Sequence, residues 1–261
     1  MNNHAVELNY EEFGSGKPLI FIHGYPLNRT IWYPVVPLME THARLILPDL
    51  RGHGASPAPG GIYHMEALAS DVAQLMDKLE IEQAILVGHS MGGYVALAFA
   101  RDYPGRVKGL ALVASHCFAD EPDKKKARLE NAERVEKTGD IQFIIKTMLP
   151  SLIGDLCWQD KLRPLMLARS TAGTAGVLRG MAEREETCRV LVELELPIAV
   201  ITGEKDVFIP LQRTEEMAHK MKKPWLEVMR GCGHMPMLEA PQEVSRVLIE
   251  LTQRCTIKED N

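Results

Sequence analysis

The sequence has no excess of basic residues. Lys and Arg number 30 against 35 Asp and Glu, which gives a net charge of −5. Proteins that bind nucleic acid usually carry a basic patch or stripe, so we expect no nucleic-acid partner.

No apolar run approaches the roughly 18 residues of a membrane span, and the polar start MNNHAVELNYEEFGSG lacks the apolar core of a signal peptide. We therefore expect a cytoplasmic protein, a monomer or homodimer, with no membrane partner.

Cysteine is sparse and scattered. The five cysteines are odd in number and form no C-x-x-C pair: Cys117, Cys157, Cys188, Cys232 and Cys255. Neither a disulfide framework nor a zinc site is indicated by this spacing. The cysteines are predicted to be reduced thiols, mostly buried, and the sequence shows no spacing typical of metal ligands.

What the sequence does contain is an alternation of short apolar runs with helical patterns. Strands are predicted at residues 18–24, 43–50, 83–90, 107–115, 196–206 and 224–230. Helical patterns lie between them at 30–40, 64–80 and 211–221, and a closing helix is predicted at 243–255. Such alternation is typical of βαβ units, so the fold class is α/β with a mostly parallel sheet flanked by helices.

The alternation is interrupted by a long segment without strand patterns. Residues 118–190 contain a charged helical run and two amphipathic helical patterns. We predict a helical cap insertion there, and a core domain made of residues 1–117 and 191–261. The charge run from Asp120 to Lys137 is interpreted as a solvated helix face, because its acidic and basic residues are spaced for pairing along a helix.

The strongest chemical signal is the stretch GHSMGG around Ser90. It matches G-x-S-x-G and stands between a predicted buried strand and a predicted helix. A sharp strand-to-helix turn needs glycines close to the serine, and a helix N-terminus directs N–H groups at developing negative charge. Ser90 is therefore predicted to be a nucleophile rather than a small residue in a turn.

A serine hydroxyl needs a base to accept its proton and a carboxylate to orient that base. His234 lies in the glycine-rich loop GCGH between the last predicted strand and the last helix. Asp206 follows a predicted strand, where α/β enzymes place functional groups. We predict His234 as the base and Asp206 as the acid, with Glu204 and Asp120 as alternative acids.

These motifs together resemble the α/β-hydrolase family over nearly the whole chain. The segments that carry the resemblance are FIHGYPLNRTIW, PDLRGHGAS, GHSMGG and the paired loops TGEKD and GCGH. The resemblance implies two short strands before Pro18, within residues 5–14, and hence an eight-stranded sheet. It also implies an oxyanion hole made by the backbone N–H groups of Tyr25 and Met91.

The remaining histidines near the motifs and several apolar side chains are assigned roles by their positions. His23 is predicted to brace the oxyanion loop, His53 to sit in a turn, and His89 to point away from the reaction. His116 follows a strand end and either borders the site or is a satisfied polar group. The candidate substrate-binding side chains are Tyr25, Met148, Met166 and Met235.

The resemblance implies a carboxylic ester hydrolase that works through an acyl-enzyme on small to medium acyl esters. Lactones, such as acyl-homoserine lactones or enol-lactones, are included, and the mechanism requires no cofactor. One alternative is a carbon–carbon bond hydrolase of dienone acids, in which Arg169, Arg179 or Arg184 would hold the substrate carboxylate. A second alternative is a non-catalytic ligand-binding homologue. An aspartate-nucleophile enzyme is disfavoured by Ser90.

Overall fold

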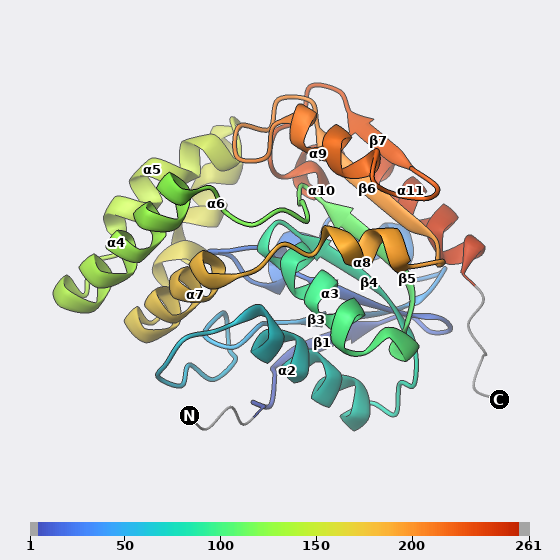
Figure 1. The fold of residues 1–261 in the computed structure, drawn as a ribbon, viewed down its shortest axis with the longest axis horizontal. Helices are drawn as coiled ribbons and strands as arrows, with labels where there is room; N and C mark the ends of the chain where they lie inside the picture. Colours follow the sequence, from blue (N-terminus) through green and yellow to red (C-terminus); the bar gives the residue numbers. More distant parts are fainter. Residues whose placement is uncertain (1–4, 256–261) are drawn as a thin grey trace.

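A seven-stranded sheet forms the centre of the computed structural model, which describes residues 5–255 (Figure 1). Its strands stand in the order β1-β3-β2-β4-β5-β6-β7, and all neighbouring pairs are parallel except β1 with β3. The strands are β1 (Tyr10–Phe13), β2 (Pro18–Ile22), β3 (Arg44–Pro48), β4 (Ala84–His89), β5 (Val107–Val113), β6 (Ile198–Gly203) and β7 (Leu226–Met229). The family fold predicted from the sequence is confirmed.

The prediction of eight strands is wrong for the described residues, where one strand and not two precedes Pro18. The reason lies in the hydrogen bonds of the segment before β1. The Val6 N–H donates to the Asp71 carboxylate and the Asn9 N–H donates to the Ser56 hydroxyl, each at 2.8 Å. Side chains thus satisfy these amides in place of a neighbouring strand.

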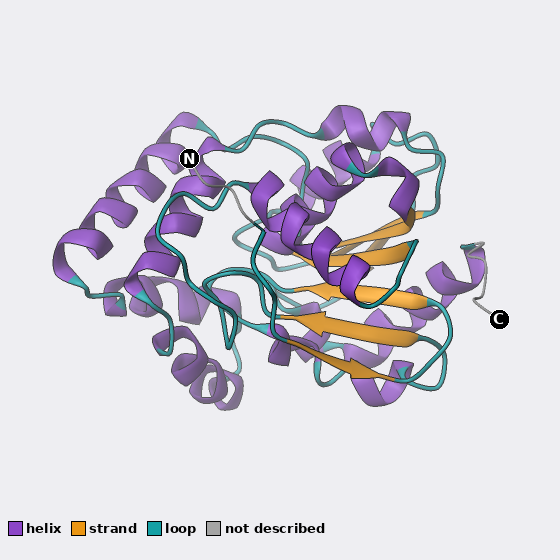
Figure 2. Ribbon diagram, turned by 90° about the horizontal axis from the view of Figure 1, so that it is seen from below, coloured by secondary structure: helices purple, strands orange, loops and turns teal. Residues whose placement is uncertain are grey.

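Each face of the sheet is covered by helices because successive side chains along a strand point to opposite faces (Figure 2). In β2, Ile20 and Ile22 join one buried cluster, while Leu19 and Phe21 join the other. The first cluster is covered by α2 (Met65–Lys78), α3 (Met91–Asp102), α8 (Cys188–Glu193) and α9 (Leu211–Ala218). The second is covered by η1 (Arg29–Trp32), α1 (Val36–Met39), α10 (Pro236–Glu239) and α11 (Pro241–Arg254), while the short turn η2 (Pro104–Arg106) leads into β5.

Between β5 and β6 the chain is helical. The helices are α4 (Pro122–Thr138), α5 (Gln142–Leu152), α6 (Leu156–Leu167) and α7 (Thr171–Glu183), followed by α8, in which the predicted boundary at residue 190 falls. Helix α4 packs along α7, and α5 packs along α6. In Figure 1 these four helices stand together beside one end of the sheet.

The prediction of reduced cysteines is wrong for Cys117 and Cys188, which form a disulfide. They are separated by 71 residues in sequence, and their Cα atoms lie 4.8 Å apart. The two residues meet because the helical segment leaves the sheet domain after β5 and returns to it at α8, so its two ends lie side by side. Cys157 is an exposed free thiol, while Cys232 and Cys255 are buried free thiols.

Within residues 5–255 no helix combines the length and the apolar character that crossing a bilayer requires.

Candidate active site

Ser90 occupies the turn between β4 and α3. Its backbone has φ 51° and ψ −114°, a conformation that costs a side-chain-bearing residue on the order of 1 to 3 kcal/mol. The Ser90 N–H donates to the Val113 carbonyl at 2.9 Å, and the Ser90 carbonyl accepts from the Ser115 hydroxyl at 2.8 Å. Val113 at the end of β5 and Ser115 just after it therefore bind both the N–H and the carbonyl of Ser90.

The glycines of the turn are required by close backbone approach. A Cβ added at Gly88 would lie 2.4 Å from the Gly92 carbonyl oxygen, and one added at Gly92 would lie 2.2 Å from the Ile22 carbonyl oxygen. Both separations are far below a van der Waals contact. The motif around Ser90 thus lets the first turn of α3 pack directly on the end of β2.

The side chains of His234 and Asp206, the predicted base and acid, are in contact. His234 Nδ1 lies 2.8 Å from Asp206 Oδ2, and both side chains are buried. Asp206 Oδ1 also accepts the N–H groups of Phe208 at 2.9 Å and Ile209 at 3.0 Å. Because a carboxylate is an acceptor, the Nδ1 proton stays on His234, which leaves Nε2 available as a base.

The two alternative acids have other partners. Glu204 accepts the Gly231 N–H at 2.8 Å. Asp120 is buried between Arg128 and Arg184, at 2.6 Å and 3.0 Å. Among the three carboxylates considered, Asp206 is therefore the one that contacts His234.

His89, predicted from the sequence to point away from the reaction, contacts the loop that carries the predicted base. His89 Nε2 donates to the His234 carbonyl at 2.9 Å, and the two rings lie 4.9 Å apart. Burial lowers the pKa of His89 well below its usual value, so the ring is neutral. His89 points away from solvent, into the loop that carries His234.

Ser90, His234 and Tyr25 line one cavity of about 340 Å³. Its apolar wall comes from α5 and α7 and consists of Phe143, Ile144, Met148, Leu178 and Met181. Of the methionines predicted to bind substrate, Met148 lines the cavity. Met166 and Met235 are fully buried in the core and do not line it, so we do not retain them as pocket residues.

One strip of α4 also faces this cavity. Lys124, Ala127, Arg128 and Asn131 recur at the spacing of one helix face and line the cavity together. The prediction that the segment from Asp120 to Lys137 is a solvated helix face is therefore incomplete, because one strip of this helix lines the cavity. Three of these four side chains are polar, so a search for apolar residues at helical spacing could not reveal the strip.

The two predicted oxyanion amides stand at the ends of adjacent elements. Met91 is the first residue of α3, where an amide has no partner inside its own helix. Tyr25 follows the His23-Gly24 pair after β2, and its hydroxyl is buried without a hydrogen-bond partner among the described residues. Burial raises the pKa of Tyr25 to about 12, so the phenol stays protonated.

His23 supports this loop from behind. Its Nε2 accepts the Leu50 N–H at 2.9 Å, and its Nδ1 lies 3.1 Å from the Gly24 carbonyl, to which it donates. Burial lowers the pKa of His23 to about 4, which keeps the ring neutral. This is the bracing role that the sequence suggested.

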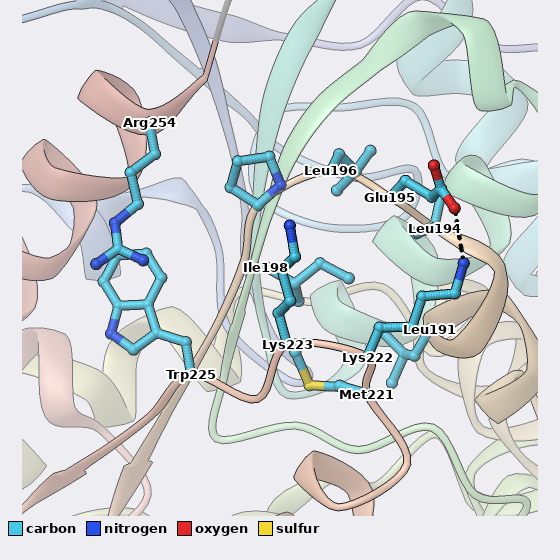
Figure 3. A pocket seen from close by; sticks show the side chains of 11 residues that line it. Leu191, Leu194, Glu195, Leu196, Ile198, Met221, Lys222, Lys223, Trp225 and Arg254 are labelled. Atoms are coloured by element: carbon cyan, nitrogen blue, oxygen red, sulfur yellow. Dashed lines mark hydrogen bonds and ion pairs between the residues drawn. The ribbon is translucent and has the colours of Figure 1, made fainter.

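A larger cavity, of about 410 Å³, is lined by none of Ser90, Asp206 and His234 (Figure 3). It opens beside Ile198, where β6 begins, whereas Asp206 follows the end of β6. Figure 3 shows the Lys222–Glu195 ion pair on one side and Arg254 beside the ring of Trp225 on the other. None of the predicted catalytic residues lines it, so its size does not make it the active site.

In the described part of the chain, no group of three or more His, Cys, Asp or Glu side chains could hold a metal ion.

Comparison with known proteins agrees with this fold. The family model of the alpha/beta hydrolase fold matches residues 17–241. The chain belongs to this family. The sheet and the helices described above are thus the fold of this family.

Three relatives illustrate the range of this family. The solved structure of a thermophilic esterase from Thermogutta terrifontis aligns with a TM-score of 0.90 and 36% identity, covering 95% of this chain and 93% of that one. The enol-lactonase of Burkholderia xenovorans LB400 aligns with a TM-score of 0.86 at 22% identity, covering 94% and 96%. In sequence, the 2-hydroxymuconate semialdehyde hydrolase of Pseudomonas sp. (strain CF600) is 30% identical, covering 90% of this chain and 86% of the relative.

Proposed function

We propose that this α/β-hydrolase is a carboxylic ester hydrolase that uses Ser90, His234 and Asp206 through an acyl-enzyme. The observation that carries the proposal is the 2.8 Å contact between His234 and Asp206 in the wall of the cavity that Ser90 lines. A buried carboxylate that fixes the tautomer of a histidine in the same cavity as a strained serine supports activation of the serine hydroxyl. The 36% identical esterase adds support.

The proposed reaction runs in two halves. Ser90 Oγ attacks the ester carbonyl while His234 Nε2 accepts its proton, and the N–H groups of Tyr25 and Met91 receive the oxyanion. The tetrahedral intermediate then collapses, and His234 gives the proton to the departing alcohol. Water repeats the sequence on the acyl-enzyme and releases the acid and Ser90. Asp206 stabilises the imidazolium throughout and keeps its own charge.

The cavity sets the proposed substrate class. Its volume of about 340 Å³ and its apolar wall from α5 and α7 suit small to medium acyl groups. A lactone is an intramolecular ester and needs no further machinery, so enol-lactones and acyl-homoserine lactones belong to the same proposal. A small molecule of this kind is the only partner that the proposal requires.

The experiment is a substrate panel for the wild type and Ser90→Ala. Values of kcat/KM are measured for p-nitrophenyl esters of increasing acyl length and for several lactones. Ser90-dependent turnover that peaks at short acyl esters supports a general esterase, and a preference for lactones assigns a lactonase. Absence of Ser90-dependent turnover on every compound overturns the proposal and favours the non-catalytic alternative or a different bond.

Carbon–carbon hydrolysis is the second candidate, and Arg169 favours it. Of the three arginines considered, Arg179 pairs with Glu136 and Arg184 with Asp120. Both terminal nitrogens of Arg169 are buried without a hydrogen-bond partner, and its guanidinium lies 4.8 Å from the ring of Tyr25. Its Nε donates to the Thr174 hydroxyl at 3.4 Å, and Arg169 stands behind Tyr25, outside the residues that line the catalytic cavity. A buried cation without a carboxylate partner is costly, and a substrate carboxylate that reached past Tyr25 would compensate it.

Dienone acids in the same panel separate this candidate from the first. Turnover of a dienone acid that depends on Ser90 and falls in Arg169→Gln, with no ester turnover, would favour carbon–carbon hydrolysis. The 30% identical semialdehyde hydrolase makes this comparison worthwhile.

A further inference from the structure

A second cavity of about 340 Å³ adjoins the catalytic one. We call it the side chamber and define it by Asp120, Glu121, Lys124, Phe208, Arg213 and Glu216, which line it. Lys124 and Phe208 line the catalytic cavity as well. These two side chains therefore form the partition between the two spaces.

The side chamber lies on the side of the predicted base. The Phe208 ring lies 5.0 Å from the His234 ring, and the Phe208 N–H donates to Asp206. In ester hydrolysis the departing alcohol must approach the histidine, since it takes its proton from there. The space next to His234, beyond Phe208, is thus available to the leaving group, whereas the apolar wall of α5 and α7 suits the acyl group.

The charges of the side chamber are almost all compensated. Arg213 pairs with Glu121 and with Glu216, each at 2.9 Å. Asp120 is held by two arginines, as described above. Lys124 is half-buried, and within residues 5–255 no carboxylate lies within ion-pair distance of its ammonium.

Lys124 also attracts the Asp120 carboxylate, but that carboxylate is already held by Arg128 and Arg184. A half-buried ammonium that makes no ion pair, placed at the junction of two cavities, is complementary to an anionic ligand. We propose that the side chamber is the leaving-group subsite and that Lys124 selects substrates whose alcohol carries a carboxylate. This inference rests on the proposed ester hydrolysis and specifies its substrate. Hydrolysis leaves the carboxylate of the alcohol unchanged: the acyl group passes to Ser90 and then to water.

The first test compares two acetate esters with the same acyl group, 4-acetoxybenzoate and its neutral analogue 4-acetoxybenzamide. The quantity measured is the ratio of their kcat/KM values, since differences in intrinsic reactivity cancel when enzyme variants are compared. We expect Lys124→Met to lower the ratio about tenfold and Lys124→Arg to preserve it, because one ion pair in a partly desolvated site is worth on the order of 1.4 kcal/mol. Lys125→Met, which removes an exposed neighbouring charge on α4, is the matched control and leaves the ratio unchanged.

A binding measurement separates this inference from the proposed function. Calorimetric titration of Ser90→Ala with the product 4-hydroxybenzoate should show binding that weakens about tenfold in the Ser90→Ala, Lys124→Met double variant. If the wild type hydrolyses both esters but Lys124→Met leaves the ratio unchanged, the side chamber is not a carboxylate subsite and the esterase proposal stands. If neither ester is hydrolysed, the esterase proposal fails, and equal affinity of 4-hydroxybenzoate for both variants overturns the Lys124 assignment independently.

Discussion

The ring of His89 donates a hydrogen bond to the main-chain carbonyl of His234, so the residue before the predicted nucleophile fixes the loop of the predicted base. Replacing His89 by Ala removes this bond and leaves a gap under the loop. Because a displacement of about 1 Å can cost 10²-fold in rate, we expect kcat to fall between about tenfold and a hundredfold with a smaller change in KM. Steady-state kinetics check this.

The control for this variant is His53→Ala, which removes another buried neutral histidine that hydrogen-bonds within its own turn. A loss of kcat of the same size in both variants would mean that general destabilisation, and not placement of His234, explains the effect.

The strained backbone of Ser90 predicts a trade between stability and activity. Glycine adopts φ near 51° with little cost, so Ser90→Gly should raise the free energy of unfolding by about 1 kcal/mol relative to Ser90→Ala, which keeps a Cβ. Both variants should lack esterase activity, because both lack the hydroxyl. Urea denaturation measures the difference, and a Ser90→Gly protein less stable than Ser90→Ala would contradict the assigned strain.

The serine turn could be predicted from the sequence because its chemistry is local. The glycines, the buried strand and the following helix are contiguous, so one short stretch contains the whole signal. The loops of Asp206 and His234 could be located for a related reason: each directly follows a strand of a parallel sheet, and the carboxyl ends of such strands meet at one edge.

Features that depend on contacts between distant parts of the chain could not be predicted from the sequence. The disulfide joins Cys117 and Cys188, which are 71 residues apart in sequence and belong to a scattered, odd-numbered set of cysteines. Met235 adjoins His234 in sequence, yet its side chain points into the core. Phe208 and Lys124 share the wall of a cavity although helices of the insertion separate them in the chain, and no pattern along either segment records that contact.

The disulfide predicts a large effect on stability. A cross-link that closes a loop of this length stabilises by about 4 kcal/mol in the chain-entropy description. We expect the double variant Cys117→Ser, Cys188→Ser to lower the Tm by several degrees under oxidising conditions. Cys157→Ser, which removes an exposed free thiol, should leave the Tm unchanged. A double variant as stable as the wild type would show that the bond does not form in solution.

The pKa of His23 predicts how stability depends on pH. Burial lowers this pKa to about 4, against about 6.5 in the unfolded chain, so between these values the unfolded state binds more protons. Above pH 6.5 the neutral His23 ring leaves the free energy of unfolding at its full value. As the pH falls from 6.5 toward 4, protonation of His23 in the unfolded chain lowers that free energy. At pH 5 we expect a loss on the order of 2 kcal/mol, measured by urea denaturation at pH 7 and pH 5. His23→Asn should show a smaller loss; an identical pH dependence in the two proteins would exclude His23 as a cause.

The hydrogen bond between Asp206 and His234 predicts a purely catalytic defect for Asp206→Asn. The amide keeps the shape of the carboxylate but can favour the wrong histidine tautomer and does not stabilise the imidazolium. We expect kcat for a p-nitrophenyl ester to fall about 10⁴-fold while the far-ultraviolet circular dichroism spectrum is unchanged. Activity near that of the wild type would remove Asp206 from the mechanism.

Covalent labelling tests whether Ser90 is a nucleophile that His234 activates. The protein is incubated with diethyl p-nitrophenyl phosphate, in which attack by the serine oxygen on phosphorus releases p-nitrophenol, and the labelled peptide is located by mass spectrometry. We expect one equivalent of p-nitrophenol, a diethylphosphoryl group on the peptide that contains Ser90, and loss of labelling in Ser90→Ala and His234→Ala. Absence of label on Ser90, or equal labelling of Ser90 in His234→Ala, would contradict the proposed activation of Ser90.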